Sequence, residues 1–453
     1  MLKQLGFQDK SFYKDFLFLT FPMALQNLLT TAVNMLDNVM IGQLGAVPIA
    51  AVGLANKVFF LYSIITFGLC GGGAVFINQF WGKKDTVGIK KVLFLNLILS
   101  VLFAFCFFAV AFFAPHQVMR ILTNDSEAVQ IGAVYLKTIS VSYLMSAVIF
   151  AFSFFLKSME KPRYPLMTAL VSIVVNFCIN YTLIFGKFGF PVLGVQGAAI
   201  GTVCARAVEM VLIVFLAFRS ISFLRRGMRE YLMIDRAFVG KYLKTSVPVI
   251  GNEGFWALGV TVMAAVYARV STDAIAAINI VNLISDAASV FIFGASNAAA
   301  IIVGKQIGLK RTQQAYLYAA RFSRLAPLLG LLFGLLAIGA APLFIRCFAI
   351  TDELSALAFR LTVIMAGFMP FRTFTLINIV GVLRSGGDTV FCFWTDFTGI
   401  WLIGVPFTAV SGLLLGCPIE VVYPLSLCEE LVKSLIIIQR LKRGNWITDL
   451  VNE

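Results

Sequence analysis

The residues best suited to chemistry lie in the first long apolar stretch of the chain, Phe16 to Ile41. Read as a helix, this stretch places its polar side chains at spacings of three and four, so they share one face. These side chains are Gln26, Asn27, Thr30, Thr31, Asn34, Asp37 and Asn38. An ionisable residue inside an apolar helix is costly unless it faces a bundle interior or a wet cavity. The pattern predicts an ion- or proton-binding site at Asp37, or else a structural polar stripe that bonds to neighbouring helices.

Three further polar residues are expected at the depth of Asp37. Asn176 and Asn180 are four residues apart and share a helix face, and Thr202 lies about eight residues into the next apolar stretch. A carboxylate with amide and hydroxyl oxygens can hold Na⁺, here at Asp37 and Asn180. Burial also favours a neutral carboxyl, so Asp37 could carry a proton instead. The structural alternatives are a pair between Asp37 and Lys57, and helix-to-helix hydrogen bonds from either asparagine.

A second cluster of ionisable residues is expected near mid-membrane in the second half of the chain. It consists of Glu253, Asp286, Arg372 and Asp396. Such groups are expensive to bury unless they are paired. Three acids against one arginine leave an excess of negative charge, which suits a cation or proton pathway. The alternative is a salt-bridge network in which Glu253 pairs with Arg372 and holds this half together.

The composition of the chain indicates that these groups lie within a membrane. The 453 residues are 60% hydrophobic and 13% charged, with a mean hydropathy of +0.92. Soluble domains carry about 25% charged residues, so this chain is expected to be integral to a membrane. Eight scattered cysteines and one histidine predict neither a disulfide framework nor a metal centre. No cleavable signal and no Walker motif are recognised, so neither secretion nor ATP as the energy source is expected.

Twelve apolar segments predict an all-α membrane protein. Each is long enough for a hydrocarbon core of about 30 Å. Their expected limits are 14–41, 48–80, 92–114, 130–156, 163–186, 194–218, 242–269, 275–305, 322–346, 356–383, 389–415 and 419–439.

Basic residues predict the orientation of these spans. Lys and Arg collect after spans two, four, six, eight and twelve, whereas the alternate loops are poor in them. By the positive-inside rule, both termini and the basic stretch Phe218 to Lys244 are expected in the cytoplasm. The net charge of +14 is therefore attributed to membrane orientation and not to nucleic-acid binding.

The two halves of the chain repeat. At an offset of 226 residues, Pro22 meets Pro248 and Asn56 meets Asn282. Self-similarity at half the chain length indicates a duplicated six-span unit. Six spans leave both copies in the same orientation, so they should be parallel repeats with the substrate path between them. The expected division is an N-terminal lobe at 1–217, a linker at 218–241 and a C-terminal lobe at 242–453.

These features together resemble the multidrug and toxic compound extrusion (MATE) family. The resemblance rests on Pro22, Asp37, the run Asn-Gln-Phe-Trp-Gly-Lys-Lys-Asp that ends span two, and three C-terminal runs. Those runs are VPVIGNEGFWALG, GVLRSGGDT and GNWITDL. The resemblance implies a V-shaped pair of six-helix bundles that exports organic, often cationic compounds against H⁺ or Na⁺. Glu253 matches the family's span-seven glutamate, but span ten shows Arg372 where Na⁺-coupled NorM-like members carry an acid.

The function expected from the sequence is secondary antiport, with no enzyme activity and no cofactor. The chain should expel organic cations in exchange for H⁺, or for Na⁺, across a bacterial cytoplasmic membrane. We expect a monomer among membrane lipids, with no nucleic-acid partner. The first alternative is a lipid-linked sugar flippase of the same superfamily, which would favour a more cationic cavity. The second is a channel or receptor that lacks coupled transport.

Overall fold

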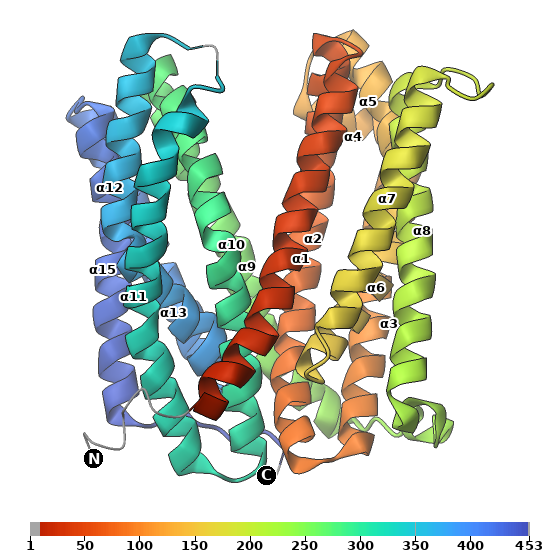
Figure 1. The fold of residues 1–453 in the computed structure, drawn as a ribbon, viewed down its shortest axis with the longest axis vertical. Helices are drawn as coiled ribbons and strands as arrows, with labels where there is room; N and C mark the ends of the chain where they lie inside the picture. Colours follow the sequence, from red (N-terminus) through yellow and green to blue (C-terminus); the bar gives the residue numbers. More distant parts are fainter. Residues whose placement is uncertain (1–9, 349, 452–453) are drawn as a thin grey trace. The chain divides into compact units, whose positions relative to one another are not determined.

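Long helices make up most of the protein. A computed structural model describes residues 10–348 and 350–451 (Figure 1), with the side chains of Asn34, Met35, Met228 and Leu232 excepted. Within these residues, eleven helices are long and apolar enough to cross a membrane. The fold is therefore all-helical and multi-pass, as the apolar segments predict. Most of the N-terminal stretch in which no cleavable signal was recognised lies outside the described residues.

The first half of the chain contributes six spans. They are α1 (Lys10–Gly42), α2 (Ala46–Lys83), α3 (Thr86–Phe113), α6 (Val141–Ser158), α7 (Arg163–Phe185) and α8 (Gly194–Ser220), with the shorter α4 (Pro115–Leu122) and α5 (Ser126–Ile139) before α6. The expected span at 130–156 is thus divided at Ser140. The hydroxyl groups of Ser140 and Ser142 donate to carbonyl oxygens three residues back, at 2.7 and 2.6 Å. Such bonds compete with the regular helical ladder and bend it.

The second half contains longer and less regular helices. They are α9 (Arg236–Val270), α10 (Thr272–Gly308), α11 (Thr312–Ile345), α12 (Asp352–Leu376), α13 (Thr389–Gly399), α14 (Val405–Ala409) and α15 (Ile419–Arg443). Three π-helical stretches interrupt them, η4 (Ile377–Leu383), η5 (Ile400–Gly404) and η6 (Val410–Leu414). A π turn widens the helix and is often found at functional sites.

The twelfth expected span is the helix α15, which is 25 residues long. It is not among the eleven apolar spans. The reason is its charge, because Glu420, Glu429, Glu430 and Lys433 all lie within it. Figure 1 shows α15 beside α12, and α12 beside α11.

The contacts divide the chain into two compact units. Unit N contains Leu25–Ile77 and Asp85–Leu243, and unit C contains Met1–Ala24, Asn78–Lys84 and Lys244–Glu453. Helix α1 is continuous through residues 24 and 25, so one helix supplies both units. The lobe boundaries expected at 217 and 242 stay a prediction.

Each unit has its own apolar core. In unit N the core includes Tyr62, Met119 and Tyr143, all fully buried. In unit C, Phe12 at the start of α1 packs with Phe322 of α11, with ring centroids 5.1 Å apart. Two helices far apart in sequence are thereby packed within one core.

The basic linker is held against unit N by a buried lysine. It contains two short 3₁₀ turns, η2 (Ser222–Arg225) and η3 (Met228–Leu232). Lys90 of α3 pairs with Glu230 at 2.7 Å and also donates to the carbonyl oxygen of Arg226 at 2.5 Å. The Lys90 side chain is only 3% exposed. Burial, with the nearby Glu230 carboxylate, raises the pKa of Tyr231 in this linker to about 12.

The end of the chain packs into unit C. Trp446 is 1% exposed, and residues 448 and 450 bond to the side chain of Gln79 in α2. The amide nitrogen of Gln79 donates to the carbonyl oxygens of Ser385 and Thr448 at 3.1 and 3.2 Å, and its amide oxygen accepts from the Leu450 N–H. Residues 448 and 450 are thus held by hydrogen bonds against the last turns of α2.

Candidate functional site

Asp37 lies at one end of a chain of hydrogen bonds in unit N. The Asn180 amide nitrogen donates to Asp37 Oδ1 at 2.8 Å and to Asn176 Oδ1 at 3.2 Å. The Asn176 amide nitrogen lies 3.3 Å from the hydroxyl of Thr202 and donates to it. Three helices, α1, α7 and α8, therefore bring together the four residues that depth and helix face predict.

One oxygen in this row of hydrogen bonds, Asn180 Oδ1, has no partner among the described residues. Asn176 and Asn180 are 4% and 0% exposed, and Asn180 Oδ1 is buried without a hydrogen-bond partner among the described residues. A Cβ at Gly201 of α8 would lie 2.0 Å from that oxygen, so only glycine allows this approach. Carboxylate, amide and hydroxyl oxygens at hydrogen-bonding distance can hold a proton or a hard cation.

The charged residues around Asp37 do not neutralise it by a direct pair. Lys57 is exposed, and no ion pair joins it to Asp37 among the described residues. The structural alternative that paired them is therefore wrong. Arg206 of α8 pairs with Glu209 at 2.7 Å, one turn further along the same helix.

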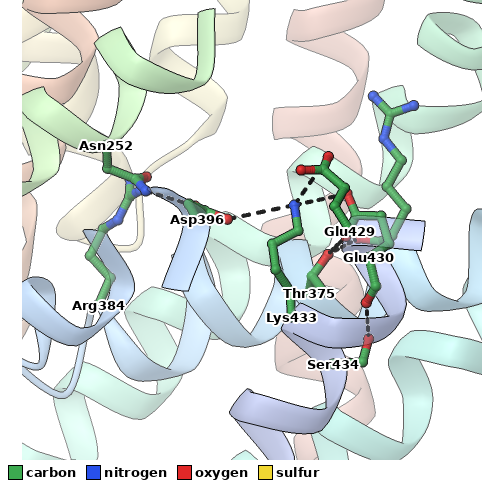
Figure 2. Close-up of polar contacts among 9 residues, drawn as sticks. Asn252, Thr375, Arg384, Asp396, Glu429, Glu430, Lys433 and Ser434 are labelled. Atoms are coloured by element: carbon green, nitrogen blue, oxygen red, sulfur yellow. Dashed lines mark hydrogen bonds and ion pairs between the residues drawn. The ribbon is translucent and has the colours of Figure 1, made fainter. Parts of the chain in front are cut away.

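Unit C contains a larger buried network of charges (Figure 2). Arg384, just after η4, donates to Glu253 Oε1 at 2.9 Å and to Asn252 Oδ1 at 2.7 Å. Asn252 in turn donates to Asp396 Oδ2 at 2.7 Å. Asp396 also faces Lys433 of α15, with Lys433 Nζ 3.7 Å from its Oδ1. The side chain of Arg384 is 4% exposed.

The four ionisable residues expected in this half fall into two groups. Glu253 and Asp396 belong to the network around Asn252, whereas Arg372 of α12 donates to Ser285 of α10 at 2.7 Å. Asp286, which follows Ser285, is exposed and has Arg372 as its charged neighbour. The alternative in which Glu253 pairs with Arg372 is wrong, because Arg384 takes that place.

Sequence reasoning missed the charges of α15 and the role of Arg384. Lys433 lies 3.5 Å from Glu429 Oε1 and 3.1 Å from Glu430 Oε1, and all three residues are buried. The sequence could have predicted these contacts, because Glu429 and Glu430 lie four and three residues before Lys433 and such spacings bring side chains together on a helix. Arg384 was recognised as part of a motif but was not assigned a partner.

No group of three or more His, Cys, Asp or Glu side chains that could hold a metal is found in the described residues. The hydrogen-bonded group at Asp37 contains one carboxylate and the neutral oxygens of amide and hydroxyl side chains, so it is not a cluster of that kind. The unit C network already contains two cationic side chains. The two sites therefore differ in chemistry, although each lies among membrane-length helices.

Membrane-length helices with buried ionisable side chains define the class of this protein as a multi-pass membrane protein. The chain belongs to the MatE family, whose model matches residues 22–182 and 248–410. The two matched ranges begin at Pro22 and Pro248, the residues that the internal repeat pairs. The family is one of transporters and not of enzymes.

Curated relatives match almost the whole chain. The uncharacterized transporter YisQ of Bacillus subtilis (strain 168) is 24% identical over 439 residues, covering 97% of this chain and 96% of its own. The probable multidrug resistance protein NorM of Thermotoga maritima is 23% identical over 407 residues, covering 88% of this chain and 85% of its own.

Solved structures share the fold. A multidrug resistance MATE family transporter in an outward-facing conformation has a TM-score of 0.85 at 17% identity, covering 95% of this chain and 96% of its own. A MATE structure in a straight conformation has a TM-score of 0.84 at 18% identity, with the same coverage. The fold of this chain is that of the MATE transporters.

Proposed function

We propose that this MatE-family transporter is a secondary antiporter that exports organic cations in exchange for H⁺, with Na⁺ as the alternative coupling ion. The observation that carries the proposal is the chain from Asp37 through Asn180 and Asn176 to Thr202. It joins a carboxylate to neutral oxygens within three membrane-length helices. A carboxylate in that setting is a functional site by default.

The charge of unit C supports a cationic substrate. Three carboxylates, those of Asp396, Glu429 and Glu430, surround the single ammonium of Lys433. Arg384 and Glu253 offset one another. The network is therefore acidic, whereas a flippase for a pyrophosphate-linked lipid would be expected to present cations. Several relatives, the NorM of Thermotoga maritima among them, carry names that refer to multidrug resistance, which agrees with export of small organic molecules.

The proposed setting is a bacterial inner membrane with both termini in the cytoplasm. The Lys/Arg excess of the 218–241 linker supports that orientation. We further propose that the transporter works as a monomer among membrane lipids and needs no cofactor.

The test is gradient-driven efflux in a drug-hypersensitive bacterial host and in inverted vesicles. Collapsing the pH gradient should abolish export of a cationic dye, and collapsing the Na⁺ gradient alone should leave it. Asp37→Asn should give a folded protein without gradient-driven export. Asp15→Asn, at an exposed position of the same helix, is the matched control. Full export by Asp37→Asn at normal expression would refute the assignment.

A further inference from the structure

The charges on α15 form a cluster that the proposed Asp37 site does not use. Lys433 Nζ lies 3.1 Å from Glu430, 3.5 Å from Glu429 and 3.7 Å from Asp396. Figure 2 shows Lys433 between Asp396 on one side and the two glutamates on the other. All three α15 residues are less than 10% exposed. One ammonium group is thus shared among three carboxylates, of which Glu429 and Glu430 are buried and Asp396 is 15% exposed.

The cluster contains more negative than positive charge. With every group ionised, three carboxylates against Lys433 leave two net negative charges. The neighbouring pair of Arg384 and Glu253 is neutral by itself and is joined to the cluster through Asn252. Buried charge without a partner is strongly unfavourable, so the cluster should bind something positive. Because Lys433 already fills the centre, a metal cation would meet the ammonium, whereas a proton needs no space of its own.

The hydrogen bonds single out one carboxylate as the proton acceptor. Asp396 Oδ2 accepts from Asn252 at 2.7 Å, and Glu430 Oε2 accepts from the hydroxyl of Thr375 at 2.5 Å. Glu429 Oε2 is buried and has no hydrogen-bond partner among the described residues. Glu429 is therefore the carboxylate whose ionised form is least supported by its surroundings.

The elements packed around α15 offer Glu429 few other charges. Its charged and titratable neighbours are Lys433, Glu430, Asp396 and, from α9, Tyr267. The stretches η5, α14 and η6, which pack on α15, contain no titratable side chain. Helix α12 contributes the neutral Thr375 to Glu430, and its Arg372 acts on Tyr423, which precedes Glu429 by six residues on α15.

We propose that Glu429 carries an exchangeable proton, which makes the α15 cluster a second proton-binding site of this transporter. The proton adds to Glu429 Oε2 and forms an O–H bond, and its release returns the electron pair to that oxygen with no other bond changed. For its role in transport this inference rests on the proposed H⁺ exchange, but binding itself can be measured at equilibrium without transport.

Protonation of Glu429 alters the pairing of Lys433. With Glu429 neutral, the ammonium is shared by Asp396 and Glu430; with Glu429 ionised, all three compete for it. Asp396 is also bonded through Asn252 to Arg384. The charge state of α15 is thereby linked to α13 and α9 by direct contacts.

The test is infrared difference spectroscopy of the purified full chain in lipid nanodiscs, titrated with acid and base. The wild type should show the carbonyl band of a protonated carboxyl group that disappears as the pH rises. Asp37→Asn serves as the parent for these variants, so that the first proposed proton site adds no band; in that background Glu429→Gln should lose the band and Glu420→Gln should keep it. Glu420 is the matched control because it lies on the same helix in an exposed pair with Arg360. A band that survives in Glu429→Gln in that background, or its absence in the Asp37→Asn parent, would overturn the proposal.

A second variant keeps Glu429 in place. A Cβ at Gly404, at the end of η5, would lie 3.3 Å from Glu429 Oε2, and the backbone there is ordinary right-handed helix. Gly404→Ser adds a donor for that oxygen and should move the titration of the band to lower pH. Gly404→Ala adds the same Cβ without a donor and should not do so. Equal titrations in the two variants would contradict the assignment, whatever becomes of Glu429→Gln.

Failure of the proposed H⁺ coupling and failure of the proton site at Glu429 give different results. If efflux by the wild type ignores the pH gradient while the band titrates as expected, the coupling proposal fails and the proton site stands. If efflux needs the pH gradient and the band is unaffected by Glu429→Gln, only the proton site fails.

Discussion

Replacing Glu253 with Gln removes one charge from the buried pair of Glu253 and Arg384. Breaking a buried pair on one side costs about 3–5 kcal/mol. The Arg384 side chain is 4% exposed and that of Glu253 is 18% exposed, so the uncompensated charge is the buried guanidinium. Because Asn252 still accepts from Arg384 and Gln keeps a carbonyl acceptor, we expect the lower end, about 3 kcal/mol. That is roughly a 150-fold loss in the folding equilibrium.

The assay is a double-mutant cycle measured by unfolding of the purified protein in detergent. Glu253→Gln with Arg384→Met should regain at least about 2 kcal/mol of the loss, because neither charge is then stranded. The matched control pairs Glu253→Gln with Arg372→Met. Arg372 bonds to Ser285, so these two changes should add within about 0.5 kcal/mol. A larger coupling to Arg372 than to Arg384 would refute this interpretation of the network.

Three further predictions test other parts of the molecule. Gly201→Ala places a Cβ 2.0 Å from Asn180 Oδ1, so the amide must turn away from Asp37; we expect a loss of about 1–3 kcal/mol and a clear drop in gradient-driven efflux. Gly53→Ala, where a Cβ meets nothing within 4 Å, should change neither quantity. In a cysteine-free background, membrane-impermeant labelling from outside should reach Phe190→Cys and miss Arg226→Cys, and the reverse would overturn the orientation. Burial, only partly opposed by the pair with Arg440 at 2.7 Å, raises the pKa of Asp388, which precedes α13. The contribution of this carboxyl is therefore fully present below about pH 4 and is lost as the pH rises through its folded pKa. The difference in thermal stability between wild type and Asp388→Asn should accordingly fall over that range, and a constant difference would contradict it.

Most helices could be predicted from the sequence because apolar length is a strong signal in a membrane. The span expected at 163–186 is Arg163–Phe185, and the one expected at 194–218 is Gly194–Ser220. The division at Ser140 and the π turns could not be predicted. Hydroxyl groups bond to the backbone close to these irregular stretches, as Thr408 does to the Gly404 carbonyl oxygen at 2.6 Å, and such bonds leave no trace in hydrophobic periodicity.

Pairings were harder to predict than the helices themselves. Depth and helix face were enough to bring Asp37 and Asn180 together, because each lies near a well-defined helix end. For Glu253 the structural alternative named the wrong arginine. Helix α9 is 35 residues long, well beyond the span of a bilayer, so depth counted from its start is ambiguous. Depth also carries no information about rotation around the helix axis.

The discontinuous composition of unit C imposes an order on its biosynthesis. Phe12 packs against Phe322, which the ribosome adds 310 residues later, or roughly 15–60 s at ordinary rates of synthesis. Throughout that interval the start of α1 lacks the core into which it finally packs. The side chain of Gln79 lacks two of its hydrogen-bond partners for longer still, until Thr448 and Leu450 have been synthesised. Unit N, by contrast, has its last residue at Leu243 and can be complete well before then. Folding of unit C therefore depends on residues made long after α1 and α2, and a truncation before Thr448 should leave Gln79 without these partners and be recognised by quality-control proteases.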